Sequence, residues 1–170
     1  MRRYLSSAIV AIGAVIAMEN AVWAEEPAFL SVGAGIYDVN DSETTAESRI
    51  EYRFSEANKL WHFTPFVGMM ATAEGATYGY GGIGLEIFLG NRWILTPNLG
   101  VGLYGNGEGK DLGSSVEFRS GAELAYRFED RSRLGLTFNH ISNAGLDEPN
   151  PGTESVLLVY SMPFDKLFSD

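Results

Sequence analysis

Apolar and polar side chains alternate along most of the chain with a period of two residues, and the helical period is absent. Successive side chains of a β-strand point to opposite faces, so this alternation predicts strands. Each alternating segment is about ten residues long, the length expected of a tilted strand that crosses a membrane. Eight segments show the pattern, at residues 29–39, 47–55, 61–72, 78–89, 93–104, 115–128, 133–142 and 154–164.

The connections between these segments also alternate, between short and long. Tight turns are expected at 57–59, 90–92 and 129–132, and longer polar or glycine-rich loops at 40–46, 74–77, 106–113 and 143–153. This alternation around an even number of strands is typical of outer-membrane barrels, whose short turns and termini lie in the periplasm. We therefore predict an all-β fold, an eight-stranded antiparallel up-and-down transmembrane β-barrel of the bacterial outer membrane.

Charged side chains within the strands fall opposite the apolar faces. They are Arg49, Glu51, Arg53, Glu86, Glu117, Arg119, Glu123 and Arg127. An eight-stranded barrel is just wide enough to be filled by side chains, so these charges predict an ion-pair network inside it. The soluble alternative is a lipocalin-like barrel, which is apolar inside and polar outside. Aromatic residues near strand ends predict interfacial girdles, at Tyr37, Tyr52, Trp61, Trp93, Tyr104 and Tyr160.

The first residues resemble a targeting segment more than a part of the barrel. Two arginines follow Met1, and a short apolar run covers residues 8–17. A run of this length is too short to span a bilayer comfortably, and small residues precede Glu25 at a plausible cleavage site. We expect residues 1–24 to be a cleaved signal peptide and residues 25–170 to form one barrel domain. The alternative is a buried helix or a membrane anchor.

Composition removes several classes of site. The chain contains no cysteine, which excludes disulfides, a thiol nucleophile and a zinc–cysteine site. Its formal net charge of −10 argues against nucleic-acid binding, because no basic stripe is available to neutralise phosphates. Carboxylates near the first loop could bind a divalent cation, although dispersed carboxylates are more often solvated; they are Asp38, Asp41, Glu43 and Glu47. We predict no metal and no cofactor.

The last two strands carry a set of reactive side chains. His140 and Ser142 have the same parity as the apolar side chains of 133–142, and Glu154 has that of the apolar face of 154–164. All three are therefore expected on the lipid-facing wall, next to the loop 143–153. A serine hydroxyl needs a general base, and the imidazole needs a carboxylate that fixes its tautomer. The spacing alone leaves a second interpretation open, in which they are polar residues of the barrel rim.

These residues also carry a resemblance to a known family. Residues 140–155 read HISNAGLDEPNPGTES, which resembles the C-terminal signature of the PagL family, lipid A 3-O-deacylases of the Gram-negative outer membrane. The resemblance implies Ser142 as nucleophile, His140 as base and Glu154 as the residue that orients the imidazole. It also implies that the loop supplies an oxyanion hole, for which Asn150 and the backbone N–H of Gly145 are the candidates; Asn143 could instead hold the loop.

The expected function follows from that resemblance. It is a serine esterase that hydrolyses the ester-linked acyl chain at position 3 of lipid A, with its site towards the outer leaflet. Its partners would be lipopolysaccharide and outer-membrane lipids, and a homo-oligomer is left open. Two rivals remain, a non-catalytic small barrel with a structural or adhesive role and a lipid A acyltransferase.

Overall fold

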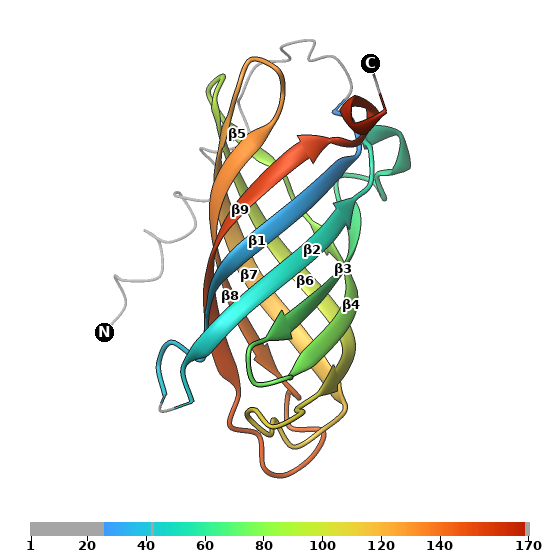
Figure 1. Cartoon of the computed structure of the whole chain (residues 1–170). Helices are drawn as coiled ribbons and strands as arrows, with labels where there is room; N and C mark the ends of the chain where they lie inside the picture. Colours follow the sequence, from blue (N-terminus) through green and yellow to red (C-terminus); the bar gives the residue numbers. More distant parts are fainter. Residues whose placement is uncertain (1–25, 42, 169–170) are drawn as a thin grey trace, which may run out of the picture.

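The computed structural model describes residues 26–41 and 43–168 and shows a closed antiparallel β-barrel (Figure 1). The predicted signal peptide, residues 1–24, lies outside the described residues. The strands are β1 (Phe29–Tyr37), β2 (Thr45–Arg53), β3 (Thr64–Thr72), β4 (Thr77–Gly84), β5 (Ile87–Leu89), β6 (Trp93–Gly105), β7 (Val116–Arg127), β8 (Arg133–Ser142) and β9 (Thr153–Pro163). The predicted all-β fold is confirmed.

Pairing of first and last strands, and of β4 with β6, closes the barrel. β1 pairs with both β2 and β9, and β4 pairs with β3 and β6. β5 also pairs with β6, so β4 and β5 are two segments of one interrupted strand. Counted in this way, the barrel has the eight strands predicted. The single strand predicted over 78–89 is interrupted at Leu85 and Glu86. The carboxylate of Glu86 reaches the guanidinium groups of Arg53 and Arg133 there, and Leu85 still bonds to β6 through Pro97.

The two ends of the barrel differ, as the loop lengths predict. The β1–β2, β6–β7 and β8–β9 connections extend from the lower end in Figure 1, and the C-terminus lies at the upper end with the short turns. Two short 3₁₀ helices, η1 (Glu56–Asn58) and η2 (Phe164–Leu167), lie near the short turns. The third strand begins at Thr64 and not at residue 61, because Trp61 has a positive φ of 63° within a turn.

The barrel interior is polar at its centre, as predicted. Glu51 and Arg119 form an ion pair with an N–O distance of 3.3 Å, and Arg53 lies 3.6 Å from Glu123. Arg133 is 1% exposed and joins Glu26 to Glu86. Charges of both signs therefore compensate one another inside the barrel, where an unpaired charge is costly.

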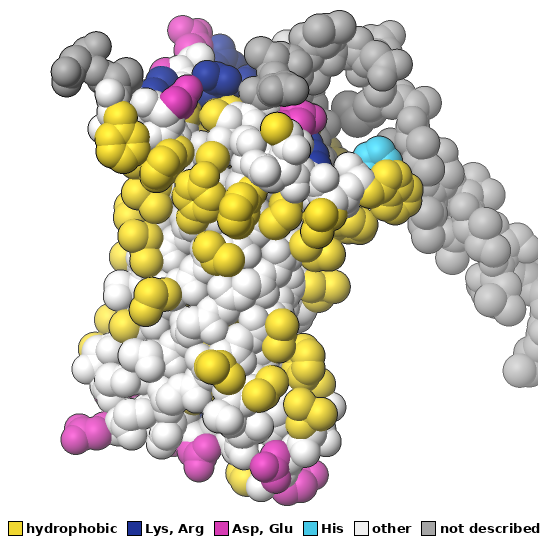
Figure 2. Space-filling view, turned by 90° about the vertical axis from the view of Figure 1, so that its right-hand side faces the viewer, with side chains coloured by type: hydrophobic (Ala, Val, Ile, Leu, Met, Phe, Trp, Pro, Cys, Tyr) yellow, Lys and Arg dark blue, Asp and Glu magenta, His cyan; other side chains and the backbone are white. Residues whose placement is uncertain are grey.

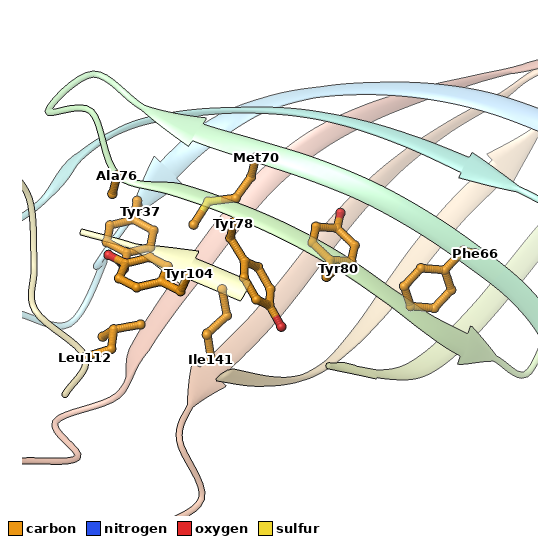
Figure 3. Close-up of a cluster of buried hydrophobic side chains, with 9 residues drawn as sticks. All are labelled: Tyr37, Phe66, Met70, Ala76, Tyr78, Tyr80, Tyr104, Leu112 and Ile141. Atoms are coloured by element: carbon orange, nitrogen blue, oxygen red, sulfur yellow. The ribbon is translucent and has the colours of Figure 1, made fainter. Parts of the chain in front are cut away.

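An aromatic cluster fills the interior near the long loops (Figure 3). The hydroxyl oxygens of Tyr37 and Tyr104 lie 2.9 Å apart, and that of Tyr104 donates to the carbonyl of Lys110. Placing Tyr37 and Tyr104 in an outer girdle was therefore wrong. They share parity with the inward glycines of their strands, and their hydroxyls find partners inside.

The outer wall is apolar. Exposed leucine, isoleucine, valine or phenylalanine side chains occur on each of the eight strands, when β4 and β5 are counted as one. Figure 2 shows hydrophobic side chains along the wall and acidic side chains gathered towards the two ends. Charges inside and apolar side chains outside are the distribution of a barrel in lipid, so the lipocalin-like alternative is wrong. Trp61, Trp93 and Tyr160 are exposed, consistent with girdle positions. Among the described residues, no helix has the length and apolar character needed to cross a bilayer.

Candidate active site

The register of β8 and β9 places His140 directly opposite Glu154. Nδ1 of the imidazole lies 2.9 Å from Oε1 of the carboxylate, and both side chains are half-buried. A neutral imidazole has one donor and one acceptor nitrogen. A carboxylate at Nδ1 favours the tautomer in which Nδ1 carries the proton, so Nε2 is left as the acceptor. The arrangement therefore prepares Nε2 to take a proton from a neighbouring group.

Ser142 lies two residues further along β8, on the same face as His140 and at the strand end next to the β8–β9 loop. Its side chain is half-buried. Its register partner on the neighbouring strand β7 is Phe118, whose side chain is exposed on the outer wall. Within residues 26–41 and 43–168, no hydrogen bond joins Oγ of Ser142 to His140. Catalytic hydrogen bonds are often long before substrate binds, so this geometry is compatible with a nucleophile and its base.

Gly152 restricts the position of the His140 ring. Its φ is +65°, and a Cβ placed there would lie 2.9 Å from Cε1 of His140. That carbon lies beside Nε2 in the ring, so the Gly152 backbone covers the edge of the imidazole that adjoins the reactive nitrogen. An L-residue would be strained at this φ and would also displace the ring. The sequence did not predict this contact, although Gly152 lies within the segment 140–155 that resembles the family signature.

The β8–β9 loop is built around Asn143, which is fully buried. Its Nδ2 donates to the carbonyls of Leu112, Asp147 and Pro149 at 3.1, 3.2 and 3.1 Å. Its Oδ1 accepts from the N–H of Gly145 at 2.8 Å. The side chain immediately after Ser142 thus holds both ends of the loop, the role considered for it from the sequence.

The two oxyanion-hole candidates differ in whether their N–H groups already donate a hydrogen bond within the loop. Oδ1 of Asn150 accepts from the backbone N–H of Asn143 at 3.1 Å. This bond uses the carbonyl oxygen of the Asn150 side chain, so the two N–H groups on Nδ2 remain candidate donors to a substrate. The N–H of Gly145 already donates to Asn143. Asn150 is therefore the stronger of the two candidate donors.

A buried ion pair connects two loops and the start of β9 beside the site. Nζ of Lys110, in the β6–β7 loop, lies 2.7 Å from Oδ1 of Asp38 and 3.2 Å from Oδ2 of Asp41, both in the β1–β2 loop. Oγ1 of Thr153, which precedes Glu154, donates to the same Asp38 oxygen at 3.1 Å. Burial disfavours the charged ammonium, but its hydrogen bonds to the two aspartates prevail and raise the pKa of Lys110.

This ion pair changes the interpretation of the first-loop carboxylates. Asp38 and Glu47 are buried beside Lys110 and Arg49, so these two are not the solvated side chains expected of dispersed carboxylates. Among the described residues, no group of three or more His, Asp or Glu side chains is arranged to hold a metal ion.

Comparison with known proteins shows which family the chain resembles in sequence. A family model described as lipid A 3-O-deacylase (PagL) matches residues 43–163. Lipid A deacylase PagL of Bordetella bronchiseptica is 32% identical over 77 residues, 44% of this chain and 43% of that protein. Lipid A deacylase PagL of Pseudomonas aeruginosa is 35% identical over 82 residues, 48% of this chain and 39% of that protein. The matched part of the chain thus spans less than half the length of either curated relative.

Among solved structures, the crystal structure of the outer membrane enzyme PagL superposes with a TM-score of 0.64 and 22% identity. The superposition covers 79% of this chain and 99% of that one, and it shows that the two share the barrel fold. The family model covers most of the chain, including His140, Ser142 and Glu154. The chain therefore belongs to the lipid A 3-O-deacylase (PagL) family.

Proposed function

We propose that the protein is an outer-membrane serine esterase that hydrolyses the ester-linked acyl chain at position 3 of lipid A. Family membership supports the substrate, and the apolar outer wall supports the location. The observation that carries the chemistry is the 2.9 Å contact between His140 and Glu154, with Ser142 on the same face of β8. That face looks outward, where a lipid ester can reach the three side chains without leaving the membrane.

The first half-reaction forms an acyl-enzyme. Nε2 of His140 takes the proton of the Ser142 hydroxyl as Oγ attacks the ester carbonyl carbon. Glu154 stabilises the resulting imidazolium through Nδ1. The negative charge on the former carbonyl oxygen is stabilised by hydrogen-bond donors, for which Nδ2 of Asn150 is the side-chain candidate. The imidazolium then protonates the departing sugar hydroxyl as its bond to the acyl carbon breaks.

Water completes the reaction. His140 removes a proton from a water molecule that attacks the acyl carbon, and Ser142 leaves with that proton restored. The products are a free fatty acid and lipid A with one free hydroxyl group. Every proton is carried by His140, and none of these steps requires a metal or a cofactor. The site lies at the loop end of β8 and β9, where water from outside the hydrocarbon region has access.

Mass spectrometry of lipid A from cells that make the protein tests this proposal. We expect the wild type to remove one hydroxyacyl chain and Ser142→Ala to remove none. Ser48→Ala is the matched control, because Ser48 is another strand serine on the outer wall, exposed on β2. Gain of an acyl chain in the wild type would support the acyltransferase, and unchanged lipid A would support a non-catalytic barrel. Deacylation retained by a folded Ser142→Ala protein would overturn the mechanism.

A further inference from the structure

The β6–β7 loop, residues 106–115, is anchored to the barrel by contacts of its own. Near its start, the N–H of Glu108 donates to the carbonyl of Glu74 in the β3–β4 turn at 3.0 Å. The carbonyl of Lys110 accepts from the hydroxyl of Tyr104 at 2.7 Å. The side chain of Leu112 is fully buried and belongs to the aromatic cluster (Figure 3). The barrel therefore fixes this loop without help from the β8–β9 loop.

The backbone of Leu112 and Gly113 contacts the β8–β9 loop at the residue before Asn150. The carbonyl of Leu112 accepts from Nδ2 of Asn143 at 3.1 Å, and the same nitrogen donates to the carbonyl of Pro149 at 3.1 Å. A Cβ placed on Gly113 would overlap that carbonyl oxygen of Pro149. The Pro149 carbonyl thus packs directly against the Gly113 backbone, and the two loops meet there.

Two features restrict this position to glycine. The φ of Gly113 is +87°, a conformation that strains an L-residue, and the overlap with Pro149 leaves no room for a side chain. A third feature fixes the backbone locally, because the N–H of Gly113 donates to Oδ1 of Asp111 at 2.8 Å. A bond from an aspartate side chain to the backbone two residues on is a common turn motif. The segment 111–113 is therefore a preformed surface for the β8–β9 loop.

We propose that Gly113 is a positioning residue for the oxyanion donor Asn150, and this inference rests on the proposed function. Asn150 directly follows Pro149 in the chain, and its Oδ1 accepts from the N–H of Asn143 at 3.1 Å. Its side-chain oxygen is thus held by one loop, and the peptide that precedes it is held by the other. A donor stabilises an oxyanion most when it is in place before the charge develops. Gly113 supplies that placement without touching the substrate.

A positioning role has a kinetic signature that a purely structural role lacks. An oxyanion donor binds the transition state more strongly than the ester, so misplacing it lowers kcat and leaves KM almost unchanged. We would measure hydroxy fatty acid release from purified lipid A in mixed micelles, per folded protein. Gly113→Ala should lower kcat about a hundredfold, the effect of a displacement of about 1 Å, and keep the apparent KM within about twofold.

Gly107→Ala is the matched control in the same loop. Gly107 also has a positive φ, +55°, but a Cβ there would overlap the carbonyl oxygen of Gly75 in the β3–β4 turn. This variant carries the same kind of strain away from the β8–β9 loop. Its kcat should stay within about twofold of wild type, because no reacting group moves. An equal loss of kcat in Gly107→Ala and Gly113→Ala would overturn the inference.

A double variant shows whether Gly113 acts through Asn150. Asn150→Ala should lower kcat about a hundredfold to a thousandfold, as removal of one oxyanion donor does. The variant with both substitutions should be at most about threefold slower than Asn150→Ala, because no donor is left to position. Losses that multiply in the double variant, or wild-type kcat in Asn150→Ala, would overturn the inference.

A milder pair of variants tests the same point if Gly113→Ala does not fold. Asp111→Ala removes one hydrogen bond from an exposed side chain and should lower kcat about fivefold. Asp111→Asn keeps an acceptor oxygen and should restore kcat. Wild-type kcat in folded Gly113→Ala, or in Asp111→Ala where Gly113→Ala is unfolded, refutes the positioning role. Failure of the proposed function looks different: the wild type releases no fatty acid, or folded Ser142→Ala still releases it.

Discussion

His140 and Glu154 are direct partners across β8 and β9, and Nδ1 of the imidazole lies 2.9 Å from Oε1 of the carboxylate on the outer wall of the barrel. The pairing fixes both side chains through backbone hydrogen bonds on either side. A rigid strand pair positions a reacting group more accurately than a loop does. The other part of the site is the β8–β9 loop, which the side-chain hydrogen bonds of Asn143 hold in place.

Replacing Glu154 by Gln should reduce kcat by about a hundredfold to ten-thousandfold, because a neutral amide neither fixes the imidazole tautomer nor stabilises the imidazolium. Ester hydrolysis by the purified, folded variant measures this. Glu129→Gln is the control, since Glu129 is a solvent-exposed carboxylate in the β7–β8 turn that pairs only with the surface residue Arg92 among the contacts of the described residues. Equal loss in both variants would contradict a role for Glu154 in the reaction.

Gly152→Ala should lower kcat by about a hundredfold, the effect of displacing a catalytic group by about 1 Å. The new methyl would meet Cε1 of His140. Gly75→Ala provides the comparison, because Gly75 also has a positive φ, +84°, with no atom within 4 Å of the added Cβ. Both variants should lose about 1–3 kcal/mol of stability from backbone strain, while only Gly152→Ala loses activity. Normal activity in Gly152→Ala would exclude the contact as a constraint on the ring.

The Lys110–Asp38 pair should make the loops less stable at alkaline pH. Its partners raise the pKa of Lys110 above the unfolded value of about 10.4. The stabilisation that this ion pair gives the folded protein is therefore fully present below the pKa of Lys110 in the unfolded chain. It is lost as the pH rises through the higher pKa of Lys110 in the folded protein. Protease susceptibility of the loops should increase over that range in the wild type. Lys110→Met and Asp38→Asn should be more susceptible at pH 8 and show no further alkaline change; a rise equal to that of the wild type would refute this assignment.

Glu51→Gln should destabilise the barrel by about 3–5 kcal/mol, since it removes one partner of a buried ion-pair network. Glu51 accepts hydrogen bonds from Tyr80 and Arg119, and it also lies 3.5 Å from Arg53. The solvent-exposed Arg92–Glu129 pair at 3.1 Å offers the contrast, because breaking a surface pair costs about 0–1 kcal/mol. Urea unfolding in detergent compares Glu51→Gln with Glu129→Gln, and equal midpoints would mean that the inner network does not stabilise the fold.

Side-chain parity was sufficient to predict most of the barrel. It placed Arg119 and Glu51 inside and the wall leucines outside, because a strand has only two faces and each environment tolerates one class of side chain. The same rule places Tyr37 and Tyr104 inside, because they share parity with inward glycines; parity therefore predicts their orientation better than their position near a strand end does. The break at Leu85 was not predictable, because it depends on Glu86 reaching Arg133 from a different part of the chain.

The site was predictable in part for the same reason. Parity put His140, Ser142 and Glu154 on one wall, and the strand register, which parity does not determine, brought His140 and Glu154 opposite each other. The position of Asn143 directly after Ser142 makes it a candidate loop anchor. The Lys110–Asp38 pair joins residues 72 positions apart through two loops, and no local pattern encodes such a contact.

The most direct test of hydrolysis by Ser142 uses purified protein and purified lipid A in mixed micelles made with isotopically heavy water oxygen. The wild type should release one hydroxy fatty acid per lipid A, with heavy oxygen in its carboxyl group, because water attacks the acyl carbon of the acyl-enzyme. Ser142→Ala should release none. Release of labelled acid by folded Ser142→Ala at the wild-type rate, or transfer of the chain to another lipid by the wild type, would contradict the account.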